Sequence, residues 1–343
     1  MGELQLAKSV VIGECLMRDG LQNLDFFVPT DTKVWLIDAL TECGFKSIEV
    51  TAFSHPKYQP QFRDGEEVLK RIKRKPGVQY RAVAVGEKAH ERLVDAAKRG
   101  LVEEPGYGMW IGVSETHARA NTGCTHDQLW EQARKVAKDA ERDGRDFRGS
   151  IATAFGCPIE GPQPPEKIIE WAKRFYELGA RRIQIADTTG EGTPKQVYET
   201  FTELRQRWPD VNFNAHFHES RGWALANCWA ALTTGCTDFD SSIGGLGGQP
   251  TNFIDRVPVG GTGQRYTPSD LTGNVRTEDL VVMLDECGID TGLDIDRVLE
   301  VGRMMERICG RPLRSWTTKS GRIPKHPTEY YYKLRERWEK TPK

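Results

Sequence analysis

Residues 30–52 read TDTKVWLIDALTECGFKSIEVTA and join a helical pattern directly to a strand pattern. Thr30 can cap the start of a helix whose apolar residues recur at helical spacing, and Gly44 can end that helix in the left-handed conformation. The β-branched run at 46–52 then predicts a buried strand. The chain is therefore expected to be built from helix and strand units of this kind.

The two patterns alternate along most of the chain. The candidate strands lie at 9–15, 46–52, 79–85, 108–114, 148–154, 181–186, 211–217 and 237–243. The helical patterns lie near 30–43, 61–74, 87–99, 125–143, 164–179, 194–207, 220–234 and 277–287. Eight strands that alternate with helices pair in parallel and can close into a (β/α)8 TIM barrel of about 250 residues. A competing open sheet would carry GxGxxG after its first strand, which this chain lacks. We therefore predict an α/β fold, a TIM barrel over residues 1–290.

Residues 291–343 extend beyond the eight units. The range 294–309 has an amphipathic helical pattern. The range 311–343 holds ten basic and three acidic residues, a net charge of +7. Its aromatic residues are Trp316, Tyr330, Tyr331, Tyr332 and Trp338. We expect a C-terminal helix and a basic aromatic tail that packs on the barrel or on the partner in a homodimer; the alternative is a basic cover near a phosphate-bearing substrate.

The composition excludes several classes of protein. The 48 basic and 49 acidic residues give a net charge of −1, which provides no electrostatic reason to expect nucleic acid or an anionic membrane as partner. No stretch approaches the roughly 20 apolar residues that span a bilayer. The N-terminus lacks the patterns of a signal or transit peptide. Eight cysteines without a CxxC pair favour a reducing cytoplasm over a disulfide scaffold or a structural zinc site.

Polar residues lie at or just beyond the ends of several predicted strands, where a TIM barrel places its active site. They are Glu14, Arg18, Asp19 and Gln22 around the first strand, Glu49 in the second, Asp187 and Thr188 after the sixth, His216 and His218 at the seventh, and Asn274 after the eighth. The barrel brings these ends together. Because buried unpaired carboxylates are costly, a shared cation is the simplest explanation for this set.

Each of these signals also has an ordinary structural interpretation. His216 and His218 are two residues apart on a strand, so both imidazoles face the same side and can bind one ion together. They can equally be hydrogen-bonded residues without a ligand. Asp19 and Asp187 can likewise cap turns or helices.

Seven segments in the same order resemble the hydroxymethylglutaryl-CoA lyases. They are RDGLQ (18–22), SIEVTAFSHPK (47–57), FGCPIEG (155–161), ADTTGEGTP (186–194), HFHESRGWALAN (216–227), DSSIGGLGG (240–248) and GNVRTEDLV (273–281). The resemblance covers residues 10 to 290. The hydroxymethylglutaryl-CoA lyases belong to a wider group of metal-dependent lyase and synthase barrels that share an Asp-Arg-Glu triad. The resemblance implies a TIM barrel, a divalent metal, and cleavage or formation of a carbon–carbon bond at an acyl-CoA.

The resemblance also implies roles for individual residues. The implied metal ligands are Asp19, His216, His218 and Asn274. Arg18 is expected to stabilise enolate charge, Glu49 to orient Arg18, Asp187 to lie near the substrate hydroxyl, and Glu14 and Glu278 to support the ligands. Gln22, Thr188 and Gln249 are expected to line the substrate site. Mg²⁺ and Mn²⁺ suit two imidazoles with oxygen ligands, as do Co²⁺, Fe²⁺ and Zn²⁺.

One position departs from the family pattern. The family loop GLGGCP carries a cysteine that is thought to move a proton, whereas here the loop carries Gln249, whose amide does not titrate. The segment from Gln249 to Asn274 is also longer than the corresponding segment of the family. Three interpretations remain open: a lyase for a different 3-hydroxyacyl-CoA or hydroxy acid, in which His216, Asp255, Tyr266 or a water moves the proton; a related aldolase or synthase acting on an oxo acid; or a barrel that binds metal and ligand without turnover.

Overall fold

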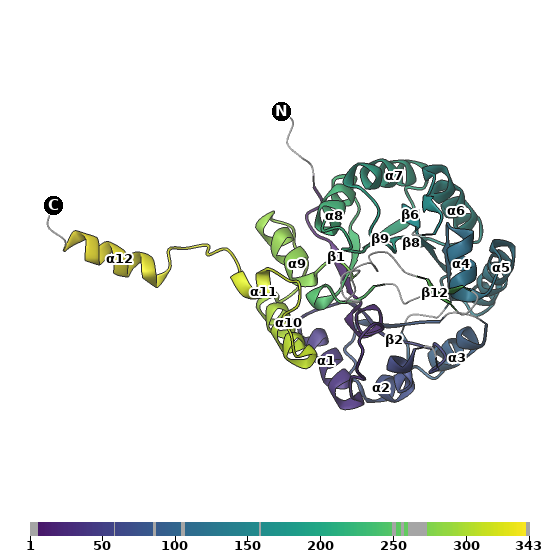
Figure 1. Cartoon of the computed structure of the whole chain (residues 1–343), viewed down its shortest axis with the longest axis horizontal. Helices are drawn as coiled ribbons and strands as arrows, with labels where there is room; N and C mark the ends of the chain where they lie inside the picture. Colours follow the sequence, from purple (N-terminus) through teal and green to yellow (C-terminus); the bar gives the residue numbers. More distant parts are fainter. Residues whose placement is uncertain are drawn as a thin grey trace.

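The computed structural model describes residues 6–57, 59–84, 87–103, 107–157, 159–248, 252–254, 257–259 and 273–340. Eight strands form one curled parallel sheet, and helices surround it (Figure 1). The strands are β1 (Val11–Glu14), β2 (Ser47–Ala52), β3 (Gln79–Val83), β4 (Gly108–Gly112), β5 (Arg148–Ala152), β8 (Arg182–Asp187), β9 (Asn212–Phe217) and β10 (Asp238–Ser241). Each of the eight predicted strands is present, which confirms the predicted α/β barrel architecture.

The sheet is continuous from β3 through β2, β1, β10, β9, β8 and β5 to β4. The first and last units of the barrel meet where β1 pairs with β10, with Val11 opposite Asp238 and Glu14 opposite Ser241. Among the described residues no ladder joins β3 to β4, so the barrel wall is open between these two strands. This order places the carboxyl ends of all eight strands at one rim.

The eight predicted helices are also present. They are α1 (Thr30–Glu42), α2 (Gly65–Arg71), α3 (Glu87–Lys98), α5 (His126–Arg142), α6 (Pro165–Glu177), α7 (Pro194–Arg207), α8 (Ala224–Thr233) and α9 (Thr277–Glu286). Their apolar faces and the outward-facing strand residues make up one continuous hydrophobic core. None of the described helices is both long enough and apolar enough to cross a membrane.

Several short elements were not predicted. They are α4 (Glu115–Thr122), the antiparallel pairs β6 (Gly156–Cys157) with β7 (Gly161–Pro162) and β11 (Asn252–Ile254) with β12 (Val257–Val259), and α11 (Thr317–Ser320). Each is too short to show a clear period in the sequence. α4 begins where the side chain of Ser114 accepts a hydrogen bond from the His117 backbone and ends at Gly123 in the left-handed conformation.

The inside of the barrel carries polar as well as apolar side chains. Arg148 and Ser150 of β5, and Arg182 and Gln184 of β8, line an internal cavity, whereas alternate positions such as Ile185 are buried apolar residues. This is the two-residue alternation of a strand with one face turned to each side. In most TIM barrels branched apolar side chains fill the interior. Here the cavity reaches down among polar side chains instead.

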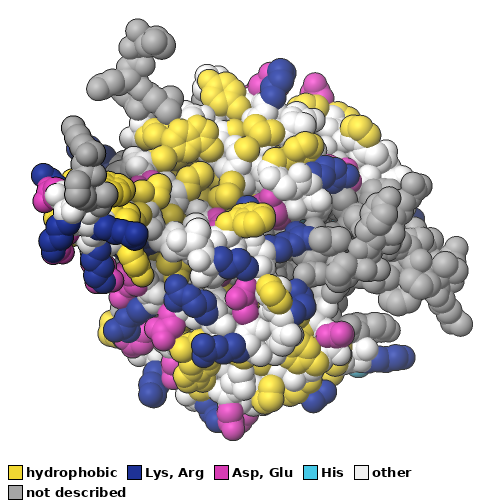
Figure 2. Space-filling model, turned by 60° about the vertical axis from the view of Figure 1, so that its left-hand side comes forward, with side chains coloured by type: hydrophobic (Ala, Val, Ile, Leu, Met, Phe, Trp, Pro, Cys, Tyr) yellow, Lys and Arg dark blue, Asp and Glu magenta, His cyan; other side chains and the backbone are white. Residues whose placement is uncertain are grey.

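The C-terminal extension divides into two parts. α10 (Ile295–Cys309) buries Val298 and Met305 and packs against α9, α1 and α11. Every residue from 323 to 340 is exposed, including all of α12 (Glu329–Glu339), which projects away from the barrel (Figure 1). On the face seen in Figure 2, basic and acidic side chains are interspersed, as the balanced composition predicts.

Candidate functional site

The four predicted metal ligands come together from separate segments of the chain. Asp19 lies in η1 (Leu16–Gly20), a π-helical turn after β1, and His216 and His218 lie at the carboxyl end of β9. Oδ2 of Asp19 is 3.3 Å from Nε2 of His216 and 3.5 Å from Nε2 of His218. The two Nε2 atoms are 3.2 Å apart. Nδ2 of Asn274 donates a hydrogen bond to Oδ2 of Asp19 at 2.9 Å.

This arrangement fits a divalent cation. Atoms that each lie about 2.1 Å from one ion stand about 3.0 to 3.4 Å apart, close to the spacing of the Asp19 oxygen and the two imidazole nitrogens. Oδ1 of Asn274 is buried and has no hydrogen-bond partner among the described residues. A half-turn of this amide exchanges its nitrogen and oxygen, and the orphaned oxygen then faces the same point as the Asp19 carboxylate.

The charged groups around the predicted metal ligands keep the carboxylate of Asp19 ionised. Burial alone would raise the pKa of Asp19, but Arg18 and hydrogen bonds from His216 and His218 hold it well below its usual value. Burial alone would lower the pKa of His216, yet hydrogen bonds to Asp19 and Asp240 raise it to about 9. A buried carboxylate that stays ionised among imidazoles is a ready ligand for a cation.

The position of Asn274 depends on two glycines, Gly247 and Gly273. A Cβ atom at Gly247, whose φ is +126°, would lie 2.5 Å from Nδ2 of Asn274. A Cβ atom at Gly273 would lie 1.7 Å from the carbonyl oxygen of Gly245. Only glycine lets these two segments approach so closely at this edge of the site.

Arg18 and Glu49 form an ion pair beside the ligand cluster. Nε of Arg18 donates to Oε2 of Glu49 at 2.6 Å, and Nη1 of Arg18 is 3.5 Å from Oδ1 of Asp19. Burial works against the charge of Arg18, but Glu49 and Asp19 raise its pKa above the usual value. The guanidinium therefore stays charged and is held in one orientation at the cavity wall.

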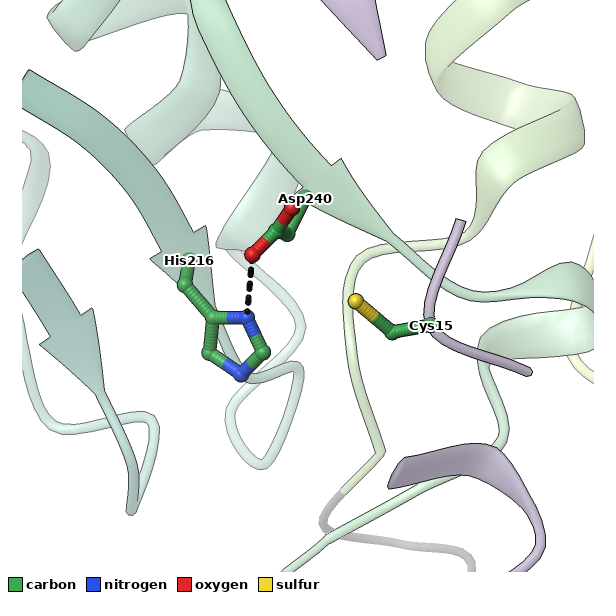
Figure 3. A group of neighbouring side chains, drawn as sticks. All are labelled: Cys15, His216 and Asp240. Carbon is green, nitrogen blue, oxygen red and sulfur yellow. Dashed lines mark hydrogen bonds and ion pairs between the residues drawn. The ribbon is translucent and has the colours of Figure 1, made fainter. Parts of the chain in front are cut away.

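Asp240 belongs to the site and was not predicted from the sequence. It lies opposite His216 in the pairing of β10 with β9, and its Oδ2 is 3.2 Å from Nδ1 of His216 (Figure 3). Asp240 also accepts hydrogen bonds from Arg81 at 3.2 Å and from Gln184 at 2.7 Å. A carboxylate on the far nitrogen of a ligand histidine fixes the ring and its tautomer. The strand alternation in DFDS could have identified this inward-facing acid.

A second group of possible ligand atoms comprises Cys15, His216 and Asp240 (Figure 3). Burial, together with the nearby carboxylates of Asp240 and Glu49, raises the pKa of the Cys15 thiol well above its usual value, so the thiolate that a metal needs is disfavoured. Asp240 is already occupied by its hydrogen bonds. We therefore favour the cluster of Asp19, His216 and His218 as the candidate metal centre.

Three other predicted residues lie close to this cluster. Nε2 of Gln22 donates to Oδ1 of Asp19 at 2.7 Å and also to the carbonyl oxygen of Gly248. Thr188 lines the cavity, and its hydroxyl accepts a hydrogen bond from the backbone of Thr153. The buried carboxylate of Asp187 accepts two backbone hydrogen bonds from the loop before α7, from Glu191 at 2.9 Å and from Gly192 at 3.0 Å. Asp187 therefore holds the backbone of this loop in place. This contact corresponds to the structural interpretation of Asp187, as a cap of a turn or helix, that the sequence left open.

Glu14 and Glu278 hold the glycine-rich segment after β10. Oε1 of Glu14 accepts backbone hydrogen bonds from Leu16 at 2.8 Å and Ile243 at 3.1 Å, and both oxygens of Glu278 accept from the backbone of Gly244. In these contacts neither carboxylate hydrogen-bonds any of the four predicted ligands; each binds backbone N–H groups instead. Burial raises the pKa of Glu14 to about 7 and that of Glu278 to about 8.

A cavity of about 570 Å³ connects these groups. It is lined at the rim by Arg18, Asp19, Gln22, Glu49, Thr188, His216, His218 and Gly248. This volume is ordinary for a small-molecule site. Gln249, Asp255 and Tyr266, the residues considered for proton transfer or substrate contact on the long loop, lie outside the described residues.

The fold and the site define an enzyme of the TIM-barrel class whose rim carries a candidate metal centre beside a charged arginine. The family model described as HMGL-like matches residues 9–305, and the chain belongs to this family. It is 35% identical to the hydroxymethylglutaryl-CoA lyase YngG of Bacillus subtilis over 90% of this chain and 96% of the relative. It is 37% identical to the mitochondrial hydroxymethylglutaryl-CoA lyase of Mus musculus over 90% and 89%.

Solved structures agree with this assignment. An HMG-CoA lyase from Acinetobacter baumannii, in complex with coenzyme A and 3-methylmalate, superposes with a TM-score of 0.81 at 33% identity and covers 94% of this chain and 98% of that one. The HMG-CoA lyase of Bacillus subtilis gives a TM-score of 0.80 at 34% identity, covering 92% and 98%. The protein is a carbon–carbon lyase of the HMGL family, as the sequence motifs predicted.

Proposed function

We propose that this lyase cleaves a 3-hydroxyacyl-CoA thioester with a tertiary hydroxyl, similar to hydroxymethylglutaryl-CoA, and that the reaction depends on a divalent metal. The observation that carries this proposal is the spacing of Asp19, His216 and His218 directly beside the pair of Arg18 and Glu49. The complex of the Acinetobacter relative with coenzyme A and a hydroxy acid supports the substrate class.

Asp19, His216, His218 and Asn274 would hold the ion, and Mg²⁺ or Mn²⁺ suits a set of two oxygens and two imidazoles. When bound, such an ion makes a coordinated hydroxyl more acidic and fixes its position. Asp240 would keep Nδ1 of His216 engaged, so that Nε2 points to the ligand cluster. Because both ring nitrogens of His216 are then in use, this geometry favours the ligand role over proton exchange with substrate.

The bond changes follow from the substrate class. The hydroxyl oxygen at C3 loses its proton, the bond between C2 and C3 breaks, and C3 becomes the carbonyl carbon of the keto product. The electron pair moves to C2, which gives the enolate of an acetyl-CoA-type thioester, and a proton then returns to C2. Arg18, held by Glu49, would stabilise the negative charge on the enolate oxygen. Gln22 and Thr188 line the same cavity and would contact the substrate, as we also propose for Gln249.

We further propose that the protein works in the cytoplasm as a homodimer. The buried cysteines Cys15, Cys43 and Cys228 are free thiols, in keeping with a reducing compartment. The exposed aromatic residues of the basic tail, Tyr330, Tyr332 and Trp338 among them, would be covered by a second copy. Sedimentation of the full chain and of a chain ending at residue 322 tests this: the full chain should sediment as a dimer and the shortened chain as a monomer.

The activity is tested by supplying the protein with Mn²⁺ and a panel of 3-hydroxyacyl-CoA thioesters and 4-hydroxy-2-oxo acids, and measuring acetyl-CoA and pyruvate. Release of acetyl-CoA from a thioester supports the proposal. Release of pyruvate alone would favour the aldolase alternative, and no release from either group would favour a synthase or a binding protein. Condensation assays in the reverse direction separate the last two.

A further inference from the structure

The cavity beside the ligand cluster reaches the one gap in the described barrel wall. In the part of the chain that the structure describes, no ladder closes the barrel between β3 and β4. The residues at this gap, 81–84 on β3 and 108–110 on β4, are all partly exposed. The next strand, β2, is buried along its whole length. The edges of the gap are therefore accessible, in contrast to the closed wall beside them.

The side chains of β4 show that the cavity passes through this gap. Met109 and Trp110 both line the cavity, although successive side chains of a strand point to opposite faces. Met109 pairs with Gly149 of β5, and a Cβ atom at Gly149 would lie 2.5 Å from the ring of Phe175 in α6. Met109 therefore faces the layer of helices, and Trp110 faces the barrel interior. A cavity that contacts both extends from the interior to the helix layer.

The part of the cavity at the gap is apolar. Leu93 of α3, in the helix layer, lines it together with residues 82–84 of β3. Two of these three, Ala82 and Ala84, have the smallest side chains that a strand can carry other than glycine, which leaves room between β3 and β4. We call this set the side pocket: Ala82, Val83, Ala84, Leu93, Met109 and Trp110. Its surface suits a hydrocarbon group, which gains free energy when it leaves water.

The side pocket lies across the barrel from the ligand cluster. In the order of the strands the gap falls between the two ends of the sheet, whereas β10 and β9 lie in the middle. Eight strands that are 4.8 Å apart and tilted by about 36° enclose a barrel about 15 Å wide. A carbon atom held beside the ligand cluster is therefore separated from the gap by roughly half that width, which a chain of about five carbon atoms spans at about 1.5 Å per bond.

We propose that the side pocket binds an alkyl chain of several carbon atoms on C3 of the substrate, and that the enzyme therefore prefers such 3-hydroxyacyl thioesters to those with only a methyl group there. The identity of the thioester rests on the proposed function, but uptake of an alkyl chain by the side pocket does not. The hydroxyl on C3 stays beside Asp19 and His216, and the chain crosses the mouth of the barrel past Trp110. Leu93 and Met109 bury its end. After cleavage the chain leaves with the keto product.

Two variants narrow the side pocket. Ala82→Leu adds three carbon atoms on β3, and Met109→Trp replaces a flexible side chain with a larger rigid one on β4. The matched control is Ala97→Leu on α3. Ala97 is partly buried and packs against the same hydrophobic core as Ala82, but it does not line the cavity. A general effect of overpacking would therefore appear in the control as well.

The binding experiment does not require catalysis. Calorimetric titration of the Mn²⁺-loaded full chain compares malates that carry methyl, propyl or pentyl on the carbon with the hydroxyl. Each methylene that enters an apolar pocket strengthens binding about fourfold, so the pentyl compound should bind at least 30-fold more tightly than the methyl compound. Ala82→Leu and Met109→Trp should reduce this gain to less than fivefold and leave the affinity for the methyl compound within twofold. Ala97→Leu should retain the gain.

Three results of this titration would overturn the proposal: equal affinities along the series, no binding of any member at millimolar concentration, or a gain that survives both narrowing variants. A repeat with saturating coenzyme A tests a competing occupant, the pantetheine arm. The pentyl compound should keep its advantage when coenzyme A is bound. Loss of the advantage would assign the side pocket to the pantetheine arm and would also overturn the proposal.

The kinetic experiment links the side pocket to the reaction. With thioesters that carry methyl or pentyl on C3, the unaltered chain should show a kcat/KM at least tenfold higher for the pentyl thioester, mainly through a lower KM. Ala82→Leu should remove this difference. Equal kcat/KM values in the unaltered chain would overturn the preference. If no thioester is cleaved but the pentyl compound keeps its advantage in the titration, the proposed function fails and the side pocket stands.

Discussion

Asp240 and His216 lie opposite each other on β10 and β9, with Oδ2 of Asp240 3.2 Å from Nδ1 of His216. This contact determines which nitrogen of His216 points to Asp19. The same carboxylate is held by Arg81 from β3 and Gln184 from β8, so three strands fix one imidazole. The orientation of the candidate metal centre is therefore built into the barrel interior.

The first prediction concerns this contact. Asp240→Ala should weaken Mn²⁺ binding 10- to 100-fold, because His216 loses the partner that fixes its ring. Asp240→Asn keeps the shape of the side chain and should weaken binding less. Equilibrium dialysis with Mn²⁺ measures both, and circular dichroism checks that the variants are folded. Unchanged affinity in Asp240→Ala would show that the contact does not orient the ligand.

The second prediction separates charge stabilisation from metal binding. Arg18→Gln should lower kcat by about 100- to 1000-fold, the usual effect of removing one donor to a developing negative charge. Glu49→Gln should have a smaller effect in the same direction, because it releases the guanidinium without removing it. Mn²⁺ stoichiometry should stay at one per chain in both. Arg119→Gln on the surface, paired with Glu115, is the control. Full activity in Arg18→Gln would remove Arg18 from the mechanism.

The third prediction tests the close approach of Gly247 to Asn274. Gly247→Ala should displace Asn274 and weaken Mn²⁺ binding at least tenfold, since the added Cβ would lie 2.5 Å from Nδ2. Gly77→Ala is a matched control: its φ of +78° is strained for alanine in the same way, but nothing lies within 4 Å of the added atom. Both variants should lose some stability, and only Gly247→Ala should lose metal affinity. Equal affinities would exclude Asn274 as a ligand.

The fourth prediction concerns pH. Burial raises the native pKa of Glu14 to about 7 from an ordinary value of 4.5. The unfolded chain therefore releases a proton that the native state keeps, and the free energy of unfolding falls as pH rises from 4.5 to 7, by an amount on the order of 3 kcal/mol. Glu14→Gln removes this contribution, so the stability of the variant relative to the unaltered chain should increase from pH 5 to pH 7 and stay level above. Urea unfolding at each pH measures it, with Glu67→Gln on the surface as control. A difference independent of pH would contradict the raised pKa.

The sequence predicted the barrel, and the meeting of polar residues at its rim, for two physical reasons. Regular alternation of apolar residues identifies strands and helices wherever they are long enough, as at 182–187 and 212–217. Parallel strands bring their carboxyl ends to one rim, so residues as distant as Asp19 and His216 were expected to meet.

The remaining features depend on the geometry of side chains and loops, which the spacing of apolar residues in the sequence does not specify. Asp240 was not predicted as a site residue, although its inward position follows from the alternation in β10. Glu14 and Glu278 hold the backbone of a glycine-rich segment, and the conformation of such a segment cannot be read from a pattern of apolar residues. The presence of Arg148 and Arg182 in the lining of the barrel cavity departs from the usual apolar packing of the fold.

The most direct test of the account is to count the ligands of a bound Mn²⁺ ion by pulsed electron paramagnetic resonance. The unaltered chain should bind one ion with two histidine nitrogens coupled to it. His218→Ala should show one coupled nitrogen and weaker binding, and Asp19→Ala should lose most of the ion. One tightly bound ion with no histidine coupling, or full binding in Asp19→Ala, would contradict the proposed metal centre.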